Sequence, residues 1–181
     1  DLCTINVLDQ VIASGVHVLK IEGRSKGAEY VHTVTSCYRE AIDAVADGTY
    51  TKEKIAAWEQ RLATVYNRGF WEGHYLGHPL GEWTKQPGSV ATEKKVYVGK
   101  GVRYYPKIQV GEFDIETGSL KAGDTILITG RAHGMIKEEL KKITVNGADA
   151  SLAAKGDKLT LVVPTKVGPG DKLYKIVAAD A

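Results

Sequence analysis

One short stretch of the sequence carries residues that could do acid–base chemistry. Glu22 lies between Lys20 and Arg24. A carboxylate beside two cations can act as a general acid or base, or can hold a substrate cation. We therefore take Glu22 and Arg24 as catalytic candidates. The alternative is that Glu22 forms an ion pair with Lys20 or Arg24 that only stabilises the chain.

Lys26 follows closely and indicates a second kind of site, one that binds phosphate. Arg24 and Lys26 come shortly before the helix expected over residues 31–45. The N-terminus of a helix attracts phosphate groups, including those of an RNA backbone. A solvated basic loop is the plainer interpretation of both residues.

Basic and aromatic residues are interleaved in the C-terminal half. Lys100, Arg103, Lys107 and Tyr104 are the RNA-binding candidates, and the same stretch also holds Lys94, Lys95, Tyr97 and Tyr105. Cations follow phosphates and rings stack on bases, so this pattern suits RNA. The alternative is an ordinary barrel in which the tyrosines are partly core and the lysines keep the protein soluble.

Sequence motifs of several other reactions are absent. There is no nucleophile elbow, no Walker-type loop, no HExxH and no visible protease triad. His74 and His78 have the spacing of two ligands on a helix, but Gly73, Gly77 and Pro79 argue against a helix there. We expect no metal site from these histidines.

The elements that must position Glu22 follow from the hydrophobic pattern. Asn6 can cap a short helix that ends at Gly15. Residues 16–21 are β-rich and predict a strand, in which Val18, Lys20 and Glu22 would share one face. Such a strand between helices is typical of a parallel α/β sheet and cannot form a sheet alone. The first 48 residues therefore need partners, either as the tail of a larger domain or on another chain.

Two amphipathic helices come next. The first covers residues 31–45 and ends at Gly48, and the second begins after the cap Thr51 and ends before Gly69. Cys37 falls on the apolar stripe of the first helix, so we expect it in the core. A stretch rich in Gly and aromatic residues then follows to residue 90 and predicts a connecting loop.

The rest of the chain alternates short β-rich runs with turn signals, the pattern of a small antiparallel barrel or sandwich. We predict strands over residues 96–98, 102–105, 107–110, 125–129, 143–145, 159–163 and 172–177. A Gly-Asp pair precedes three of these strands, at Asp124, Asp157 and Asp171. Gly suits the turn and Asp can bind its backbone, so we interpret these aspartates as structural and not as metal ligands.

Composition narrows the class of protein. The 181 residues are 43% hydrophobic and 25% charged, with a net charge of +2 and two cysteines. These values exclude a disordered, collagen-like or disulfide-rich chain, and no apolar run is long enough to span a membrane. We expect a reduced, cytoplasmic protein. The first residue is Asp1 with no targeting signal, so we expect a fragment of a longer protein.

Two blocks of the sequence resemble a known family. The first runs from Asp1-Leu2-Cys3 through Lys20-Ile21-Glu22-Gly23-Arg24 to Tyr38-Arg39-Glu40-Ala41-Ile42-Asp43, and the second is Arg68-Gly69-Phe70 with Gly73 and Leu76-Gly77. Both are similar to the peptidase U-32 family, the collagenase-like peptidases. The run from Leu120 to Gly130 is similar to a turn of that family's C-terminal domain and of domain 2 of elongation factor Tu.

The resemblance implies an α+β fold. Residues 1–48 would be the tail of an α/β-barrel catalytic domain, 49–90 a helix and a Gly/aromatic linker, and 91–181 a small antiparallel β-barrel similar to domain 2 of elongation factor Tu. Glu22 would then lie at the C-terminal end of a barrel strand, where such barrels build active sites. Cys3 would be one ligand of an iron–sulfur cluster in the full-length parent. A cluster needs four thiolates, so this chain alone should hold none, and a buried, inert thiol is the alternative.

These observations give one expected function and one alternative. The chain would be a non-catalytic C-terminal region that positions a substrate, or binds tRNA or rRNA, for a missing N-terminal catalytic domain. The parent would be a collagenase-like peptidase, by the family name, or an enzyme of RNA base hydroxylation. The alternative is a structural module that only caps the catalytic barrel or forms a homo-oligomer. We expect no membrane partner.

Overall fold

The computed structural model describes residues 1–77 and 87–179, and the chain divides into two compact units. Asp1–Thr92 belong to the first, which we name the helical unit, and Glu93–Ala178 form the second, the β unit. The expected division into catalytic tail, linker and barrel stays a prediction. Each unit is described by itself.

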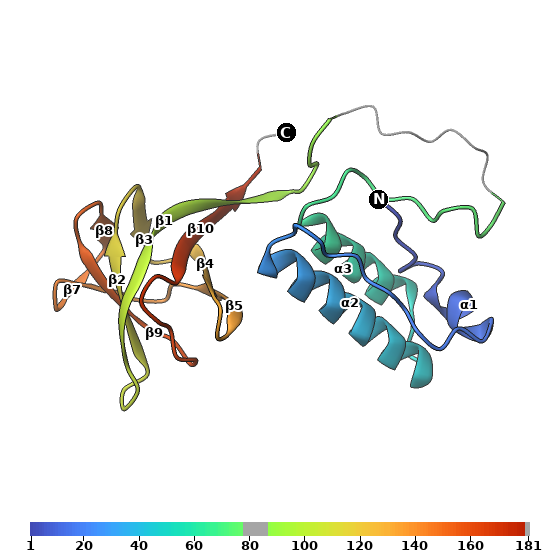
Figure 1. The fold of residues 1–181 in the computed structure, drawn as a ribbon, viewed down its shortest axis with the longest axis horizontal. Coiled ribbons are helices and arrows are strands. Elements are labelled where there is room, and N and C mark those ends of the chain that lie inside the picture. Colours follow the sequence, from blue (N-terminus) through green and yellow to red (C-terminus); the bar gives the residue numbers. More distant parts are fainter. Residues whose placement is uncertain (78–86, 180–181) are drawn as a thin grey trace. The chain divides into compact units, whose positions relative to one another are not determined.

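In its described residues, the helical unit has three helices: α1 (Leu8–Ala13), α2 (Ala28–Ala46) and α3 (Lys52–Ala63). The longer two, α2 and α3, lie side by side (Figure 1). Both predicted amphipathic helices are thus confirmed. Cys37 and Ala41 of α2 and Trp58 and Leu62 of α3 are buried in one core.

The ends of the helices test the cap predictions. The Thr51 hydroxyl accepts a hydrogen bond from the Lys54 N–H (3.4 Å), and Gly48 ends α2 with a φ of +68°, as predicted. The prediction that Asn6 caps the first helix is wrong. The cap position of α1 is Val7, and the Asn6 side chain instead donates to the Glu72 carboxylate.

The predicted strand over residues 16–21 is not formed in this structure. A β-strand is stabilised by hydrogen bonds to a neighbouring strand, and no described residue supplies that neighbour. The side chains of this segment nevertheless alternate between packed and exposed positions. Leu19 and Ile21 pack against the core of the helical unit, whereas Val18 is 83% exposed.

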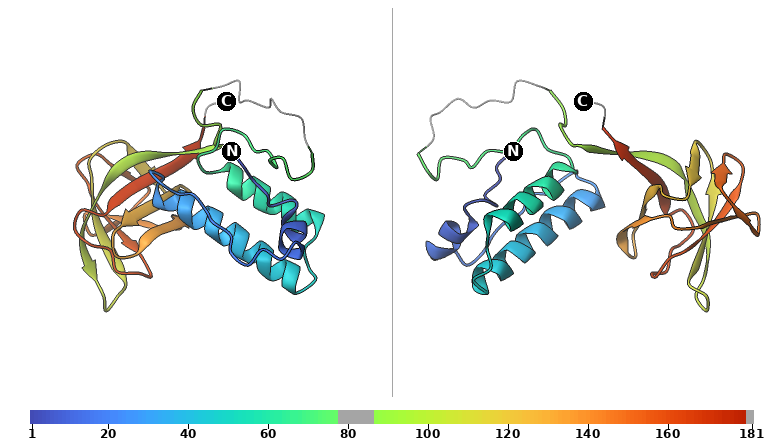
Figure 2. Two further views of the ribbon diagram at one scale, coloured as in Figure 1. Left: turned by 45° about the vertical axis from the view of Figure 1, so that its right-hand side comes forward. Right: turned by 180° about the vertical axis from the view of Figure 1, so that it is seen from behind.

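Ten strands build the β unit, namely β1 (Glu93–Tyr105), β2 (Val110–Ile115), β3 (Ser119–Lys121), β4 (Thr125–Gly130), β5 (Gly134–Glu139), β6 (Ile143–Val145), β7 (Ala148–Ala150), β8 (Leu152–Ala154), β9 (Lys158–Val162) and β10 (Lys172–Ala178). Eight of them form one antiparallel sheet in the order β5-β4-β10-β1-β2-β9-β6-β7. The remaining two, β3 and β8, pair with each other. Two further views show the curvature of the large sheet (Figure 2).

The long strand β1 merges two of the predicted strands. Its register shifts at Tyr97–Gly99 against β10 and at Gly101–Arg103 against β2, which marks two bulges. An added Cβ on Gly99 would lie 2.0 Å from the Asp114 carbonyl oxygen, and one on Gly101 would lie 2.5 Å from that of Gly168. Only glycine fits where the backbones approach this closely.

Of the other predicted strands, some are confirmed and one is wrong. Those within β4, β6, β9 and β10 are confirmed, apart from small differences at their ends. The prediction over residues 107–110 is wrong, because Gln109 has a φ of +53° in the turn that connects β1 to β2. Five further strands were not predicted from the sequence: β2, β3, β5, β7 and β8. Several of these are three residues long or polar, so their hydrophobic period is weak.

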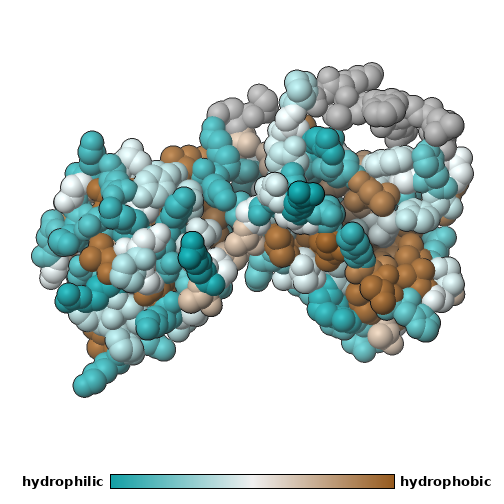
Figure 3. Space-filling view, viewed as in Figure 1, coloured by the Kyte–Doolittle hydropathy of each residue, from teal (hydrophilic) through white to brown (hydrophobic). Residues whose placement is uncertain are grey.

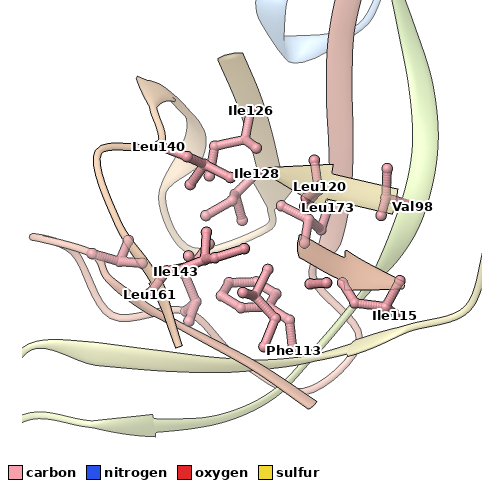
Figure 4. Packing of buried hydrophobic residues seen from close by; sticks show 14 residues of the cluster. Val98, Phe113, Ile115, Leu120, Ile126, Ile128, Leu140, Ile143, Leu161 and Leu173 are labelled. Atoms are coloured by element: carbon pink, nitrogen blue, oxygen red, sulfur yellow. The ribbon is translucent and has the colours of Figure 1, made fainter. Parts of the chain in front are cut away.

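The core of the β unit is one apolar cluster. Phe113, Leu120, Leu159 and Leu173 are completely buried in it, although they come from four different strands. The labelled side chains of this cluster point toward one another in the interior (Figure 4). The curved sheet therefore wraps around a packed apolar centre.

The three Gly-Asp turns share one geometry, as the sequence predicts. Each precedes a strand: β4, β9 and β10. Each carboxylate accepts a hydrogen bond from the backbone N–H three residues earlier, from Lys121 to Asp124 (2.9 Å), from Ala154 to Asp157 (2.8 Å) and from Gly168 to Asp171 (2.7 Å). Their structural role is confirmed.

The fold class is mixed α+β, with few helices and a large antiparallel sheet. The finer likeness to domain 2 of elongation factor Tu stays a prediction. Within the described residues, no helix combines the length and the apolar character that crossing a membrane requires.

Candidate functional site

Glu22 and Arg24 lie together in the turn that leads into α2. The Glu22 carboxylate accepts a hydrogen bond from the Arg24 backbone N–H (2.7 Å), and Ser25 has a φ of +61° within the same turn. Glu22 is exposed. The structure therefore shows Glu22 binding the backbone of its own turn, and its catalytic role stays a prediction.

Lys26 is held by aromatic rings. Its ammonium nitrogen lies 3.1 Å from the ring centre of Tyr66 and 5.9 Å from that of Tyr30. A cation over the face of an aromatic ring is attracted by the ring's electrons. Lys26 is thus oriented by Tyr66, a contact that the sequence analysis missed because about forty residues separate the two.

Beside these residues the helical unit has a groove of about 760 Å³. Much of its lining is apolar or aromatic and open to solvent, with Leu2 56%, Tyr75 63% and Leu76 52% exposed. Lys26 and Glu22 also line it. Exposed apolar side chains that gather around a groove usually mark a surface for binding.

The first residues of the chain are tied to the segment after α3. Asp1 accepts hydrogen bonds from the Arg68 guanidinium (2.9 Å) and the Arg68 backbone N–H (2.9 Å), and Leu2 forms a parallel bridge with Trp71. The Cys3 N–H donates to the Trp71 carbonyl (2.9 Å). The two blocks of the sequence that resemble the peptidase U-32 family thus meet in space.

Cys3 lies beside a second pocket of about 320 Å³, which Glu59 and Glu72 also line. Burial raises the pKa of the Cys3 thiol, and the Tyr38 hydroxyl donates to its sulfur (3.8 Å). Burial likewise raises the pKa of Cys37 to about 11. Two protonated, buried thiols do not fit an iron–sulfur cluster, which takes four thiolates.

Among the described residues, no group of three or more His, Cys, Asp and Glu side chains could hold a metal ion. His78 lies outside the described residues.

The RNA-binding candidates of the β unit lie on or near β1 but are not equivalent. Lys100 forms an ion pair with Glu116 (2.7 Å), which also accepts from the Tyr97 hydroxyl. Arg103 is exposed and lies opposite Glu112. Lys107 is exposed in the turn after β1. The structure does not gather these three into one uncompensated cationic patch.

Tyr104 faces away from these cations. Its ring packs against the core of the β unit, and its hydroxyl donates to the Val163 carbonyl (3.1 Å). A ring in this position is partly core, which was the alternative interpretation of the tyrosines.

Strand pairing supplies partners that the sequence analysis missed. Tyr174 of β10 lies opposite Tyr97, with the ring centres 5.7 Å apart, and Lys172 lies opposite Lys100. The Lys95 ammonium lies 5.3 Å from the ring centre of Tyr174. We name Lys95, Tyr97, Lys100, Lys172 and Tyr174 the basic–aromatic cluster. No local signal could have found it, because the paired residues of this cluster on β1 and β10 are more than seventy positions apart in the chain.

The fold and these residues define a class: an α+β chain whose helical unit carries an apolar groove and whose β unit carries a basic–aromatic cluster. Residues 1–85 match the model of peptidase family U32, so this part of the chain belongs to that family, as the sequence resemblance predicts.

Curated relatives cover nearly the whole chain. The chain is 49% identical over 175 residues to a protein named collagenase of Porphyromonas gingivalis, a match that covers 97% of this chain and 42% of the relative. It is 27% identical over 158 residues to tRNA hydroxylation protein P of Haemophilus influenzae, covering 87% of this chain and 33% of that protein. The chain thus spans less than half the length of these relatives.

One solved structure is similar to part of the chain. It is described as the C-terminal domain of a U32 peptidase from Geobacillus thermoleovorans, with 16% sequence identity and a TM-score of 0.41. The match covers 44% of this chain and 90% of that one.

Proposed function

We propose that this chain is a substrate-positioning region of a U32 protein and that its β unit binds RNA through the basic–aromatic cluster. The observation that carries the proposal is the pairing of Tyr97 with Tyr174 between Lys95 and the opposed lysines Lys100 and Lys172. Several relatives of this chain are named tRNA hydroxylation proteins.

The charges around the cluster favour an anion. Lys100 and Lys172 are directly opposite on neighbouring strands, where like charges repel. Glu116 compensates only one of them within the described residues. A phosphate between the two lysines would relieve this repulsion, while a neighbouring base could stack on an adjacent tyrosine, a contact that stabilises by about 1–3 kcal/mol per base.

The remaining predictions, on the parent's reaction, on Glu22, Arg24 and Cys3 and on location, are proposals as well. The parent would carry the reaction, as a collagenase-like peptidase or as an enzyme of RNA hydroxylation, in a catalytic domain outside these residues. Glu22 and Arg24 would contribute to that domain's site, and Cys3 would ligate a cluster only if the rest of the parent supplied thiolates and lowered its pKa. We place the protein in the cytoplasm.

Binding of unmodified tRNA to the chain, measured by fluorescence anisotropy over a salt series, tests the proposal. About three phosphate contacts should weaken binding roughly 20-fold between about 50 and 200 mM salt. Lys172→Glu and Tyr174→Ala should each weaken binding about tenfold or more. Lys155→Glu makes the same charge change at an exposed position of the turn before β9 and serves as the matched control.

The results of these binding measurements distinguish RNA recognition by the basic–aromatic cluster from a general effect of charge. If Lys172→Glu and Lys155→Glu weaken binding equally, only the net charge matters and the cluster is not the site. The triple change of Lys100, Arg103 and Lys107 to Glu tests the wider set of cations. Binding that survives both sets of changes contradicts RNA recognition by this face.

The second candidate is a structural or dimerising module. The observation in its favour is that several cations of the β unit are already paired, as Lys100 is with Glu116 and Lys158 is with Asp114 (3.3 Å). Such a face is solvated and needs no ligand. Sedimentation of the chain at several concentrations distinguishes a dimer from a monomer.

A further inference from the structure

Glu116 contacts two members of the basic–aromatic cluster at once. One oxygen of its carboxylate lies 2.7 Å from the Lys100 ammonium nitrogen, and the other accepts a hydrogen bond from the Tyr97 hydroxyl. These two donors lower the pKa of the Glu116 carboxyl, with Lys100 contributing more than Tyr97. A negative charge of the chain itself is therefore bound within the proposed RNA-binding cluster.

A bulge in β1 makes this double contact possible. In a regular strand, residues three positions apart point to opposite faces of the sheet. The register of β1 against β10 shifts between Tyr97 and Gly99, which adds one residue to this stretch. Tyr97 and Lys100 therefore both reach the carboxylate of Glu116. The Glu116 backbone N–H donates to the Val98 carbonyl (2.8 Å) within the bulge and holds Glu116 beside both residues.

The carboxylate at Lys100 has the chemistry of a phosphate oxygen. Both groups are anionic and accept charge-assisted hydrogen bonds from an ammonium group. Within the described residues, no comparable acceptor contacts Lys172, which lies opposite Lys100. A phosphate that binds between the two lysines must therefore displace Glu116 from Lys100.

The surface of the β unit favours ligands that bind by charge. In the space-filling view its visible face is mainly hydrophilic, with small and separate hydrophobic areas (Figure 3). An exposed ion pair such as that of Glu116 with Lys100 is weak, so an external anion can replace it. A ligand that also stacks a base on Tyr174 gains a second contact for which Glu116 does not compete.

We infer that Glu116 is an internal competitor for anions: its carboxylate occupies the position of one ligand phosphate at Lys100 and is displaced when RNA binds. This inference rests on the proposed RNA binding by the same cluster. Its consequence is selectivity. Glu116 weakens a contact that every polyanion shares and leaves base stacking unchanged, so the site favours RNA over polyanions that lack bases.

Two substitutions make the same change of charge in similar surroundings. Glu116→Gln removes the negative charge and keeps an oxygen that can accept from Tyr97. Glu112→Gln is the matched control, because Glu112 also accepts from a tyrosine hydroxyl, that of Tyr105 (3.1 Å), and lies 3.7 Å from the Lys158 ammonium nitrogen. The Tm of each variant verifies that it is folded.

Fluorescence anisotropy measures the binding of two probes: unmodified tRNA, and heparin, which is a polyanion without bases. Glu116→Gln should bind both probes about two- to fivefold more tightly than the unsubstituted chain, the range expected for loss of one exposed ion pair. The log–log salt dependence of its tRNA binding should steepen by about 0.7–0.9, because one more lysine is free to neutralise a phosphate. Glu112→Gln should change neither value. Equal gains in the two variants would overturn the inference, since only net charge would then matter.

Tyr174→Ala distinguishes failure of this inference from failure of the RNA proposal. It should weaken tRNA binding about tenfold and leave heparin binding unchanged, because only tRNA carries bases. Equal weakening of both probes would contradict the selectivity. If tRNA does not bind the chain, the RNA proposal is wrong, and heparin alone then tests Glu116. Tighter heparin binding by Glu116→Gln but not by Glu112→Gln would still support the competitor, and unchanged heparin binding would overturn it.

Discussion

The Asp171 carboxylate lies 3.0 Å from Nε2 of His133, and the His133 side chain is only 2% exposed. The same carboxylate oxygen accepts the Gly168 N–H of its own turn. Nδ1 of His133 is buried and has no hydrogen-bond partner among the described residues. Within that part of the chain, Asp171 thus supplies the one polar contact of a buried imidazole and joins the turn before β10 to the turn between β4 and β5.

This double contact predicts that Asp171 contributes more to the stability of the β unit than Asp157, which has the equivalent position in its own turn. Asp171→Ala should destabilise the β unit by about 2–3 kcal/mol, because it frees the turn and leaves the His133 ring without any partner. Asp157→Ala removes the same turn bond, but its second partner, the Asn146 side chain, is exposed. We expect about 1 kcal/mol there. Urea unfolding of both variants measures the difference, and equal losses would contradict the role of His133.

Two glycines of the β unit give a second matched pair. A Cβ on Gly99 would lie 2.0 Å from a backbone oxygen, whereas one on Gly168 would meet nothing closer than 3.8 Å. Neither glycine has a positive φ. Gly99→Ala should therefore cost about 3 kcal/mol or prevent folding, and Gly168→Ala should cost less than about 1 kcal/mol. Thermal unfolding that gives the same Tm for both variants would show that the bulge in β1 can relax.

The hydrogen bond between Tyr97 and Glu116 predicts a pH effect. This carboxylate, together with burial, raises the pKa of Tyr97 to about 12. Glu116→Gln removes the negative charge and should lower the pKa toward the ordinary value of about 10. Because the folded pKa is the higher one, the contact stabilises the fold below pH 10 and is lost as the pH rises toward 12. NMR titration of labelled tyrosines checks this, with Glu139→Gln on β5 as the control. An unchanged pKa in the Glu116 variant would contradict the assignment.

Both cysteines should resist thiol reagents in the folded chain. Burial raises the pKa of Cys37 to about 11 and also raises that of Cys3, so both stay protonated at pH 8. Since the thiolate is the reactive form, labelling should be at least about 100-fold slower than in denaturant. Cys3→Ser and Cys37→Ser variants assign each rate. A thiol that reacts rapidly in the native protein would show that one site is open and ionised.

Local pattern was sufficient for a large part of the fold. Thr51 and Gly48 mark the ends of helices because their side-chain and backbone preferences act within one turn. The Gly-Asp turns followed from the same kind of local chemistry, since each aspartate binds the backbone three residues earlier. The α+β class and the antiparallel β unit could be predicted on this basis.

The strand over residues 16–21 shows where such a prediction ends. Its residues favour β structure, but a strand forms only when another strand is hydrogen-bonded beside it. The turn at Gln109 shows the same limit. The residues around it favour β structure, and the sequence does not indicate that Gln109 has a positive φ.

The residues of the candidate site likewise depend in part on local sequence and in part on tertiary contacts. The sequence by itself determined which cations and rings are near one another along the chain, and Lys100 and Tyr104 were predicted from it as RNA-binding residues. Only the tertiary structure decided that Tyr104 faces the core and that Tyr174 and Lys172 lie opposite Tyr97 and Lys100. The physical reason is that strand register and facing are set by burial of one sheet face around a common core, which involves residues far apart in the chain.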